Sequence, residues 1–282
     1  MLLKDIELSY VDFLSGVYGK RESLNIFNEV VFQKFAWSSC EIGDRIAQEI
    51  TPDLVKYFEL VLEELKAGRP VQYVLGQAFF YEYEFTVDER VLIPRPETEE
   101  LVHWIIEEYK GKAGKGLDIG SGSGCIPIVL DKQLTNIKMS SIDVSKGAIE
   151  LANENNKKLN ASVHFSYLDV FNDQVIEDFN SLSFIVSNPP YITEKERDVM
   201  RYSVLEYEPE LALFAEGDAL GFYRRIAAIG NQMLEVGGAL YFECNEFNSD
   251  KVVDILMHKS YRDVQIKQDL QGKNRMVKGI KT

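Results

Sequence analysis

The chain has 282 residues, a formal net charge of −14, and 45% hydrophobic and 27% charged residues. This length exceeds what one small core needs, so we expect a full α/β domain and a smaller appended domain. Binding of long nucleic acid draws most of its affinity from Lys and Arg that neutralise phosphates, and the acidic charge disfavours it. We therefore expect no direct nucleic-acid substrate.

Apolar runs and potential metal ligands exclude two further classes of protein. No uninterrupted apolar run approaches the roughly 20 residues of a membrane helix, so we expect no membrane contact. The first ten residues carry Asp5 and Glu7 and lack the basic start of a signal peptide, which favours a cytoplasmic protein. The cysteines and histidines are scattered, so we expect neither a disulfide framework nor a metal site. They are Cys40, Cys125, Cys244, His103, His164 and His258.

The first quarter of the chain has helical periodicity. Apolar residues recur at helical spacing over residues 5–65, which predicts a small helical bundle. The aromatic and β-branched run over 79–87 predicts a strand or hairpin. We expect a helical domain over 1–74, a hairpin linker over 75–93 and an α/β domain over 94–282.

Strand and helix patterns alternate after residue 94. We expect helices over 98–109, 125–131, 147–159 and 220–234. We expect strands over 116–119, 139–143, 163–167, 184–187, 239–244, 263–268 and 275–280. This alternation implies a mostly parallel sheet with helices on both faces. The last two strands are too close in sequence for a crossover helix, so we expect an antiparallel pair at one edge.

A glycine-rich loop joins the first of these strands to its helix. Its sequence is Asp118-Ile119-Gly120-Ser121-Gly122-Ser123-Gly124. Glycines at this point let a ligand approach the backbone amides, although such a loop alone is weak evidence for a nucleotide site. Asp118 directly before the glycines would repel a pyrophosphate and attract a sulfonium or ammonium cation. This favours S-adenosylmethionine over a dinucleotide.

Two acidic residues follow the next two strands. Asp143 lies 19 residues after Gly124, near the interval of roughly 20 at which an acidic residue accepts hydrogen bonds from ribose hydroxyls. The alternative is that Asp143 caps the following helix. Asp169 is similarly either a cap or an acceptor for the adenine amine. We favour the binding role more strongly for Asp143.

The motif Asn188-Pro189-Pro190-Tyr191 ends the fourth expected strand, where ligands bind in doubly wound sheets. An amide or aromatic amine is a poor nucleophile because its lone pair is delocalised. The side-chain oxygen of Asn188 and the carbonyl of Pro189 can accept its two N–H hydrogens and direct the lone pair at a methyl group. Tyr191 would stack on the planar group. The alternative is a stiff turn after a strand.

At these residues the chain resembles the HemK/PrmC family, the protein-glutamine methyltransferases that modify the Gly-Gly-Gln glutamine of peptide-chain release factors. The resemblance spans nearly the whole chain. Besides the two motifs above, it rests on Gly68-Arg69-Pro70-Val71-Gln72-Tyr73, Val91-Leu92-Ile93-Pro94-Arg95-Pro96-Glu97-Thr98-Glu99, Tyr207-Glu208-Pro209, Ala212-Leu213, Gly221-Phe222-Tyr223-Arg224-Arg225-Ile226, Asp269-Leu270 and Asn274-Arg275.

The resemblance implies a Rossmann-like S-adenosylmethionine-dependent methyltransferase fold, with S-adenosylhomocysteine as product. The implied catalytic and substrate-binding residues are Asn188, Pro189, Pro190 and Tyr191, framed by Arg95, Glu97 and Thr98. The expected cofactor-binding residues are Asp118, Gly120, Ser121, Gly122, Gly124, Asp143, Asp169 and Asn188. The framing residues have the alternative of simple salt bridges and caps. The helical domain and hairpin would engage a release factor free of the ribosome.

Two departures from the family pattern are visible. Glu243-Cys244-Asn245 followed by Asn248 replaces Glu-Ile-Gly followed by Gln, and Tyr81-Glu82 stands where a hairpin glycine is common. Neither departure is expected to touch the chemical motif. Two other functions stay open at this stage. One is methylation of the exocyclic amine of adenine, and the other is a non-enzymatic scaffold with a cofactor fold.

Overall fold

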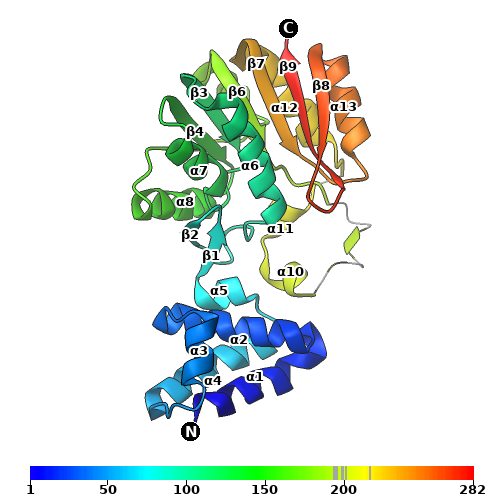
Figure 1. Cartoon of the computed structure of the whole chain (residues 1–282). Coiled ribbons are helices and arrows are strands. Elements are labelled where there is room, and N and C mark those ends of the chain that lie inside the picture. Colours follow the sequence, from blue (N-terminus) through cyan, green and yellow to red (C-terminus); the bar gives the residue numbers. More distant parts are fainter. Residues whose placement is uncertain (193–195, 198–199, 201, 216) are drawn as a thin grey trace. The chain divides into compact units, whose positions relative to one another are not determined.

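The computed structural model describes residues 1–192, 196–197, 200, 202–215 and 217–282. The chain divides into two compact units (Figure 1). A helical unit comprises Met1–Gly76 and Arg201–Tyr207, and an α/β unit comprises Gln77–Met200 and Glu208–Thr282. The hairpin therefore belongs by its contacts to the α/β unit. None of the helices in the described part of the chain is long and apolar enough to cross a membrane.

The helical unit is a small bundle around an aromatic core. Its helices are α1 (Leu3–Tyr18), α2 (Lys20–Phe35), α3 (Ser39–Arg45), α4 (Pro52–Lys66), α5 (Val71–Leu75) and α10 (Tyr202–Tyr207). Tyr10, Phe27 and Phe58 are fully buried, and the hydroxyl of Tyr10 donates to the carbonyl of Phe58 at 2.9 Å. Each such side chain stabilises the unit by about 1.5–3 kcal/mol through burial. The helical bundle expected for this segment is present.

The α/β unit is built on a seven-stranded sheet with the order β5-β4-β3-β6-β7-β9-β8. The strands are β3 (Gly114–Ile119), β4 (Ile137–Asp143), β5 (His164–Tyr167), β6 (Leu182–Ser187), β7 (Leu234–Glu243), β8 (Tyr261–Gln268) and β9 (Asn274–Lys281). β9 is antiparallel to both of its neighbours, whereas β3 to β7 pair in parallel. The predicted parallel sheet with an antiparallel terminal pair at one edge is confirmed.

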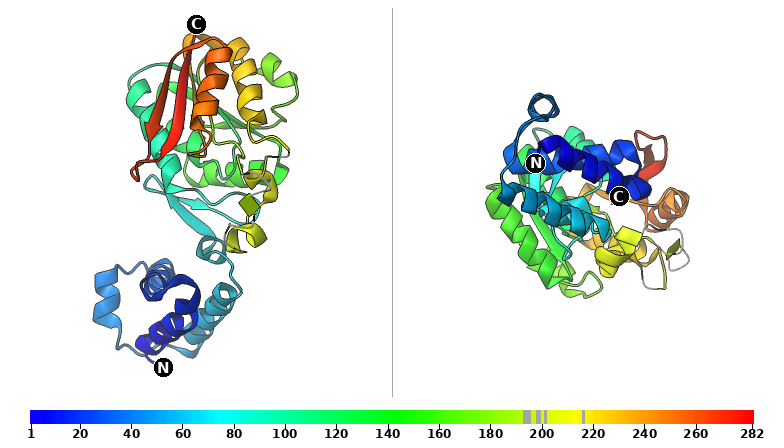
Figure 2. Two further views of the ribbon diagram at one scale, coloured as in Figure 1. Left: turned by 90° about the vertical axis from the view of Figure 1, so that its right-hand side faces the viewer. Right: turned by 90° about the horizontal axis from the view of Figure 1, so that it is seen from below.

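Helices cover both faces of this sheet (Figures 1 and 2). One group comprises α6 (Pro96–Tyr109), α7 (Cys125–Gln133) and α8 (Lys146–Lys158). The other comprises α9 (Gln174–Asp178), α12 (Gly221–Met233) and α13 (Ser249–His258), and the short α11 (Glu210–Leu213) follows α10. No helix was expected over 249–258. α13 buries only Val252 and Leu256 among its apolar residues, so its periodicity is too brief to stand out in the sequence.

The hairpin of β1 (Gln77–Phe80) and β2 (Tyr83–Thr86) turns through two residues with positive φ. These are Tyr81, with φ of 53°, and Glu82, with φ of 82°. The left-handed turn typical of glycine is therefore kept without glycine. The backbone N–H of Tyr81 donates to the carboxylate of Glu99 on α6 at 3.0 Å, which holds the turn against that helix.

Candidate active site

The two sequence motifs meet at one point of the sheet. β3 and β6 are neighbours, and Ile119 pairs with Ser187 at their carboxyl ends. The Ser187 hydroxyl also donates to the carbonyl of Ile119 at 2.7 Å. β4 and β5 lie on one side of β3, whereas β6 and β7 lie on the other, so this is the position at which the strand order reverses. The glycine loop and Asn188 therefore start side by side at the place where doubly wound sheets bind ligands.

The glycine loop needs its glycines for two different reasons. Gly120, Gly122 and Gly124 have φ of 96°, 51° and 82°, which L side chains rarely adopt. A Cβ on Gly124 would also lie 3.0 Å from the Ile128 side chain and 3.2 Å from Ala152. Gly122 instead borders open space. The loop thus packs tightly at the start of α7 and stays open at Gly122, as a backbone cradle for a ligand requires.

Asp143 lies at the end of β4 and holds the glycine loop. One carboxylate oxygen accepts the N–H of Gly122 at 3.0 Å, and the other accepts the N–H of Ser145 at 2.8 Å. The cap of α8 is Ser145, whose hydroxyl accepts from Ala148. A carboxylate offers about four acceptor positions, so Asp143 keeps capacity for hydroxyl donors. Asp169 is exposed beyond β5 and accepts the N–H of Phe171 at 2.8 Å.

Asp118 lies beneath the loop and is fully buried. One of its oxygens accepts from the hydroxyl of Ser141 at 2.6 Å, and that hydroxyl also lies 2.6 Å from the hydroxyl of Ser121. The other oxygen has no hydrogen-bond partner among the described residues. Burial raises the pKa of Asp118 well above its usual value. The predicted anion is therefore costly to maintain unless a cation approaches it.

Asn188 is held by a chain of two polar side chains. Its amide nitrogen donates to the hydroxyl oxygen of Thr98 at 3.3 Å, and the Thr98 hydroxyl donates to a carboxylate oxygen of Glu243 at 2.6 Å. Thr98 and Glu243 are both buried. Burial raises the pKa of Glu243 to about 7, while the hydrogen bond from Thr98 acts in the opposite direction. Thr98 in the first turn of α6 and Glu243 at the end of β7 thus together hold Asn188, the residue directly after β6.

The remaining framing residues, Arg95 and Glu97, lie at the start of α6. Arg95 makes a 2.6 Å ion pair with Glu208, whose side chain is 1% exposed. The second oxygen of Glu208 accepts the N–H of Ile93 at 3.4 Å, so this pair fixes the segment that leads into α6. Glu97 is half-buried, and its negative charge adds to the raised pKa of Glu243. Arg95 therefore has a structural partner in addition to its predicted framing role.

The rest of the Asn188 motif is packed rather than exposed. Pro189 is buried, and Pro190 is half-buried. Tyr191 packs against the core of the α/β unit, and burial strongly raises the pKa of its hydroxyl. A neutral ring beside the end of β6 provides an apolar wall for a planar group.

Comparison with known proteins decides the family. The family model "Methyltransferase small domain" matches residues 98–218. A release factor glutamine methyltransferase of Flavobacterium psychrophilum is 37% identical over 99% of both chains. One from Bacteroides thetaiotaomicron is 45% identical over 78% of both chains. This chain belongs to the release factor glutamine methyltransferase family.

A solved structure agrees with the fold of this methyltransferase. The 16S rRNA N2 methyltransferase of T. thermophilus, determined in complex with AdoMet and guanosine, is 16% identical and has a TM-score of 0.54. The match covers 73% of this chain and 50% of that chain. At this identity the likeness establishes the fold alone, which is the Rossmann-like fold of S-adenosylmethionine-dependent methyltransferases.

Sequence reasoning gave no role to three residues that organise the site of this methyltransferase. Glu243 matches the family pattern but was given no role, and its carboxylate accepts from Thr98, which in turn accepts from Asn188. The sequence did contain a signal for Glu243, because this carboxylate directly follows the apolar run Leu240–Phe242. A carboxylate in such a place is buried, and a buried charge normally has a partner. Asn155 bonds to the backbone of Thr86 and Ser123, and so ties the hairpin to the glycine loop. The third residue is Glu208, which pairs with Arg95 and accepts the N–H of Ile93.

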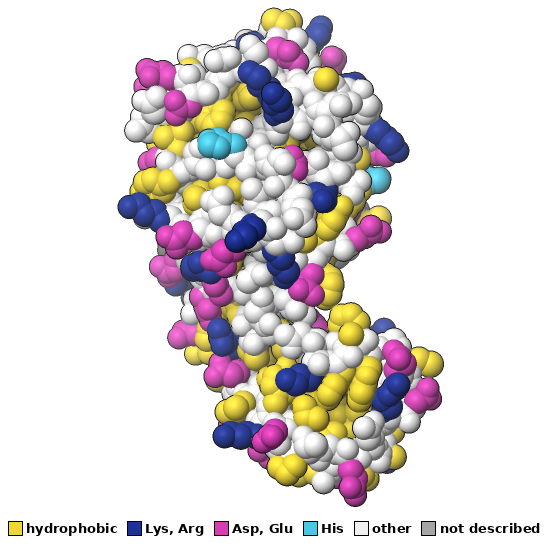
Figure 3. Space-filling view, turned by 90° about the vertical axis from the view of Figure 1, so that its left-hand side faces the viewer, with side chains coloured by type: hydrophobic (Ala, Val, Ile, Leu, Met, Phe, Trp, Pro, Cys, Tyr) yellow, Lys and Arg dark blue, Asp and Glu magenta, His cyan; other side chains and the backbone are white. Residues whose placement is uncertain are grey.

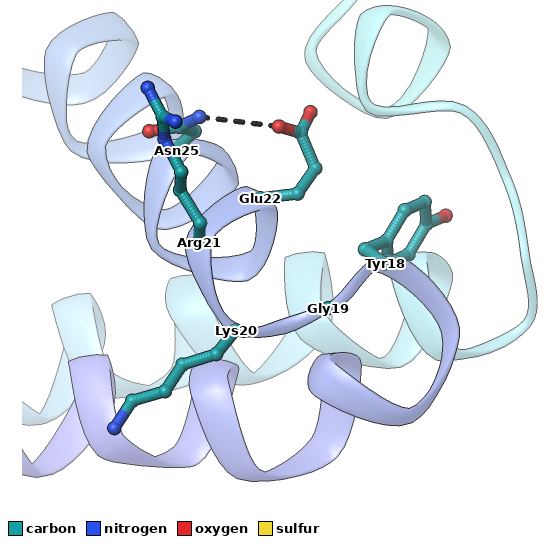
Figure 4. A pocket seen from close by; sticks show the side chains of 6 residues that line it. All are labelled: Tyr18, Gly19, Lys20, Arg21, Glu22 and Asn25. Atoms are coloured by element: carbon teal, nitrogen blue, oxygen red, sulfur yellow. Dashed lines mark hydrogen bonds between the residues drawn. The ribbon is translucent and has the colours of Figure 1, made fainter.

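Two hollows lie in the surface, one in each unit. One, of about 500 Å³, lies in the helical unit where α1 passes into α2 (Figure 4). Its lining residues are Tyr18, Gly19, Lys20, Arg21, Glu22 and Asn25. The other, of about 580 Å³, lies in the α/β unit between the hairpin turn, the start of α6 and the β8–β9 loop. It includes Glu97 in its wall and therefore reaches to within one residue of Thr98.

Proposed function

We propose that this protein transfers a methyl group from S-adenosylmethionine to the side-chain amide nitrogen of the glutamine in the Gly-Gly-Gln motif of a peptide-chain release factor. The observation that carries the proposal is the position of Asn188. This amide side chain follows β6 directly beside the loop that follows β3, so a planar nitrogen held by Asn188 lies next to a ligand held by the glycines.

The residues around the glycine loop fit S-adenosylmethionine. Gly122 leaves open space at the loop, and Asp143 at the end of β4 keeps acceptor capacity for ribose hydroxyls. The unpartnered oxygen of Asp118 suits a positively charged group. Gly120, Ser121, Gly124 and Asp169 complete the proposed cofactor site. The cofactor supplies an electrophilic methyl group on a positively charged sulfur.

The chain's own groups prepare the glutamine amide for attack. The Asn188 side-chain oxygen and the Pro189 carbonyl accept the two amide hydrogens, which turns the nitrogen lone pair towards the methyl carbon. Bound S-adenosylmethionine would supply the methyl group, and its sulfur would keep the electron pair of the C–S bond as the C–N bond forms. The amide proton then leaves to solvent. Alignment of the three reacting atoms can lower the barrier by about 7–11 kcal/mol, so no strong base is needed. Pro190 and Tyr191 wall the pocket.

The helical unit is the proposed recognition surface for the release factor. Figure 3 shows a broad area of hydrophobic side chains on one face of this unit. Its helices expose large apolar residues such as Phe13 and Val17, which are 58% and 77% exposed. Exposed apolar patches commonly mark protein-binding surfaces. A release factor must then expose two regions at once, the surface that binds the helical unit and the Gly-Gly-Gln glutamine. This favours a factor that is free of the ribosome, in the cytoplasm.

The test separates cofactor binding from chemistry. Calorimetry with S-adenosylmethionine and a transfer assay with a release factor are run on the wild type, Asn188→Ala and Asp143→Ala. We expect Asp143→Ala to weaken cofactor binding about tenfold or more, because it removes one hydrogen-bonded acceptor and loosens the loop. Asn188→Ala should keep cofactor binding and lose transfer. Transfer at the wild-type rate by Asn188→Ala would refute the proposal.

A further inference from the structure

The hydroxyl of Thr98 has one proton, and the geometry shows where it goes. At 2.6 Å from the Glu243 carboxylate, the hydroxyl donates to that carboxylate. The same oxygen can then only accept from the Asn188 side chain, 3.3 Å away. An amide presents either a donor NH₂ or an acceptor oxygen, so the ionised Glu243 forces the nitrogen of Asn188 towards Thr98. The oxygen of Asn188 is thereby the atom left for a substrate.

Protonation of Glu243 removes this constraint. A neutral Glu243 can donate to Thr98, whose hydroxyl can then donate to the oxygen of Asn188. The amide of Asn188 would turn over and present its NH₂ group to a substrate that also carries NH₂. Two donors facing each other cannot bond, so the glutamine amide would lose one of its two acceptors.

We propose that Glu243, acting through Thr98, is a positioning residue that fixes which face of the Asn188 amide meets the substrate. The inference rests on the proposed function, because only an amide or amine substrate needs the oxygen face. It also gives a reason for a carboxylate at the buried end of β7, where an unpaired charge would be costly. Thr98 hydrogen-bonds to Asn188, and a hydrogen bond from the Asn188 side chain to Glu243 acts in the same sense, because it lowers the pKa of that carboxyl. Neither Thr98 nor Glu243 is proposed to contact the reacting atoms.

Several charged and titratable groups face Glu243 and set its ionisation. They are Glu97 on α6, Cys125 on α7, Tyr191 after β6, Tyr223 on α12, Cys244 on the same strand end and Arg275 on β9. Glu97 disfavours the ionised carboxylate, whereas Arg275 favours it. The Tyr223 hydroxyl donates to the backbone carbonyl of Glu243 and not to its carboxylate. The pKa of Glu243, about 7, places its titration within the range of an ordinary assay.

The experiment measures kcat as a function of pH at saturating release factor and S-adenosylmethionine. For the wild type we expect kcat to rise with pH through about 7, because the ionised carboxylate is the productive form. Glu243→Gln should lower kcat at pH 8 about tenfold and abolish this rise, since its amide can either donate to or accept from Thr98. Cofactor affinity and the KM for the release factor should change less than twofold. Glu235→Gln, an exposed residue near the other end of β7, is the matched control.

Thr98 supplies the second, independent variant. Thr98→Val keeps the shape but breaks the chain of hydrogen bonds, so kcat should fall about tenfold, and Thr98→Ser should restore activity relative to it. A merely structural role predicts instead that kcat follows the melting temperature of each variant.

An unchanged kcat and pH profile in Glu243→Gln would overturn the inference alone. Absence of any transfer by the wild type, with cofactor bound, would overturn both this inference and the proposed function.

Discussion

Asp118 is a residue at which stability and binding are in conflict. Its carboxyl is buried with one oxygen unpartnered in the described structure, and burial raises its pKa. An acid whose folded-state pKa is raised gives its full stability below the ordinary value of 3.8, and loses it as the pH rises through the raised value. Ionisation of Asp118 therefore costs folding free energy, and a cation bound beside it would reduce that cost.

We accordingly expect Asp118→Asn to stabilise the empty protein and weaken the cofactor complex. At pH 8 its melting temperature should exceed that of the wild type by about 2–4 °C per kcal/mol gained, and the difference should vanish towards pH 4. Affinity for S-adenosylmethionine should fall about tenfold, as expected for loss of about 1.4 kcal/mol of attraction. Thermal melts across pH and calorimetry check this. Parallel melting curves with undiminished affinity would contradict the account of Asp118.

The residues of the site differ in how visible they are in the sequence. The glycine loop and Asn188 are recognisable because their chemistry depends on residue type at fixed spacing along one strand and turn. Glu243 and Asn155 act on partners 145 and 69 residues away, on Thr98 and Thr86 respectively. Packing of α6 against β7 and of α8 against β2 brings them there, and such tertiary packing leaves no local pattern in the sequence.

Among the elements, the hairpin turn has two consecutive residues whose types conflict with their backbone conformation. Tyr81 and Glu82 both have positive φ, which costs roughly 1–2 kcal/mol per L-residue. We expect Glu82→Gly to raise the free energy of unfolding of the α/β unit by about 1 kcal/mol, since the strain exceeds the entropy that glycine adds. Chemical denaturation measures the change.

A matched glycine substitution provides the control for that prediction. Glu107 is an exposed glutamate in the helix α6, so Glu107→Gly should lower the free energy of unfolding by about 1 kcal/mol. Opposite signs at the two positions identify backbone strain as the cause. Destabilisation by both substitutions would show that the turn is not strained.

Element prediction succeeded where the apolar pattern was long and failed where it was short. The strands of the parallel sheet are buried runs such as Leu182–Ser187, and their alternation with helices set the topology. β7 begins at Leu234, five residues before the expected start, because Gly237 and Gly238 interrupt its apolar pattern. α13 was missed for the same physical reason, since it buries only one side of three turns.

At the scale of the whole molecule, the chain is acidic and consists of a helical unit with exposed apolar residues and a methyltransferase unit. The net charge of −14 opposes a duplex substrate, whereas the apolar residues of the helical unit suit a protein. The helical unit also includes α10, which begins 15 residues after the end of β6, the strand that Asn188 follows. The proposed recognition unit and the proposed catalytic motif therefore include segments that are close in sequence.

The most direct test of the central claim is mass spectrometry of an intact release factor after incubation with this protein and S-adenosylmethionine. We predict a single added methyl on the glutamine of the Gly-Gly-Gln peptide, and none on a factor in which that glutamine is replaced by asparagine. Duplex DNA offered in the same reaction should stay unmodified. Methylation of DNA, or of the release factor at a residue other than that glutamine, would contradict the account.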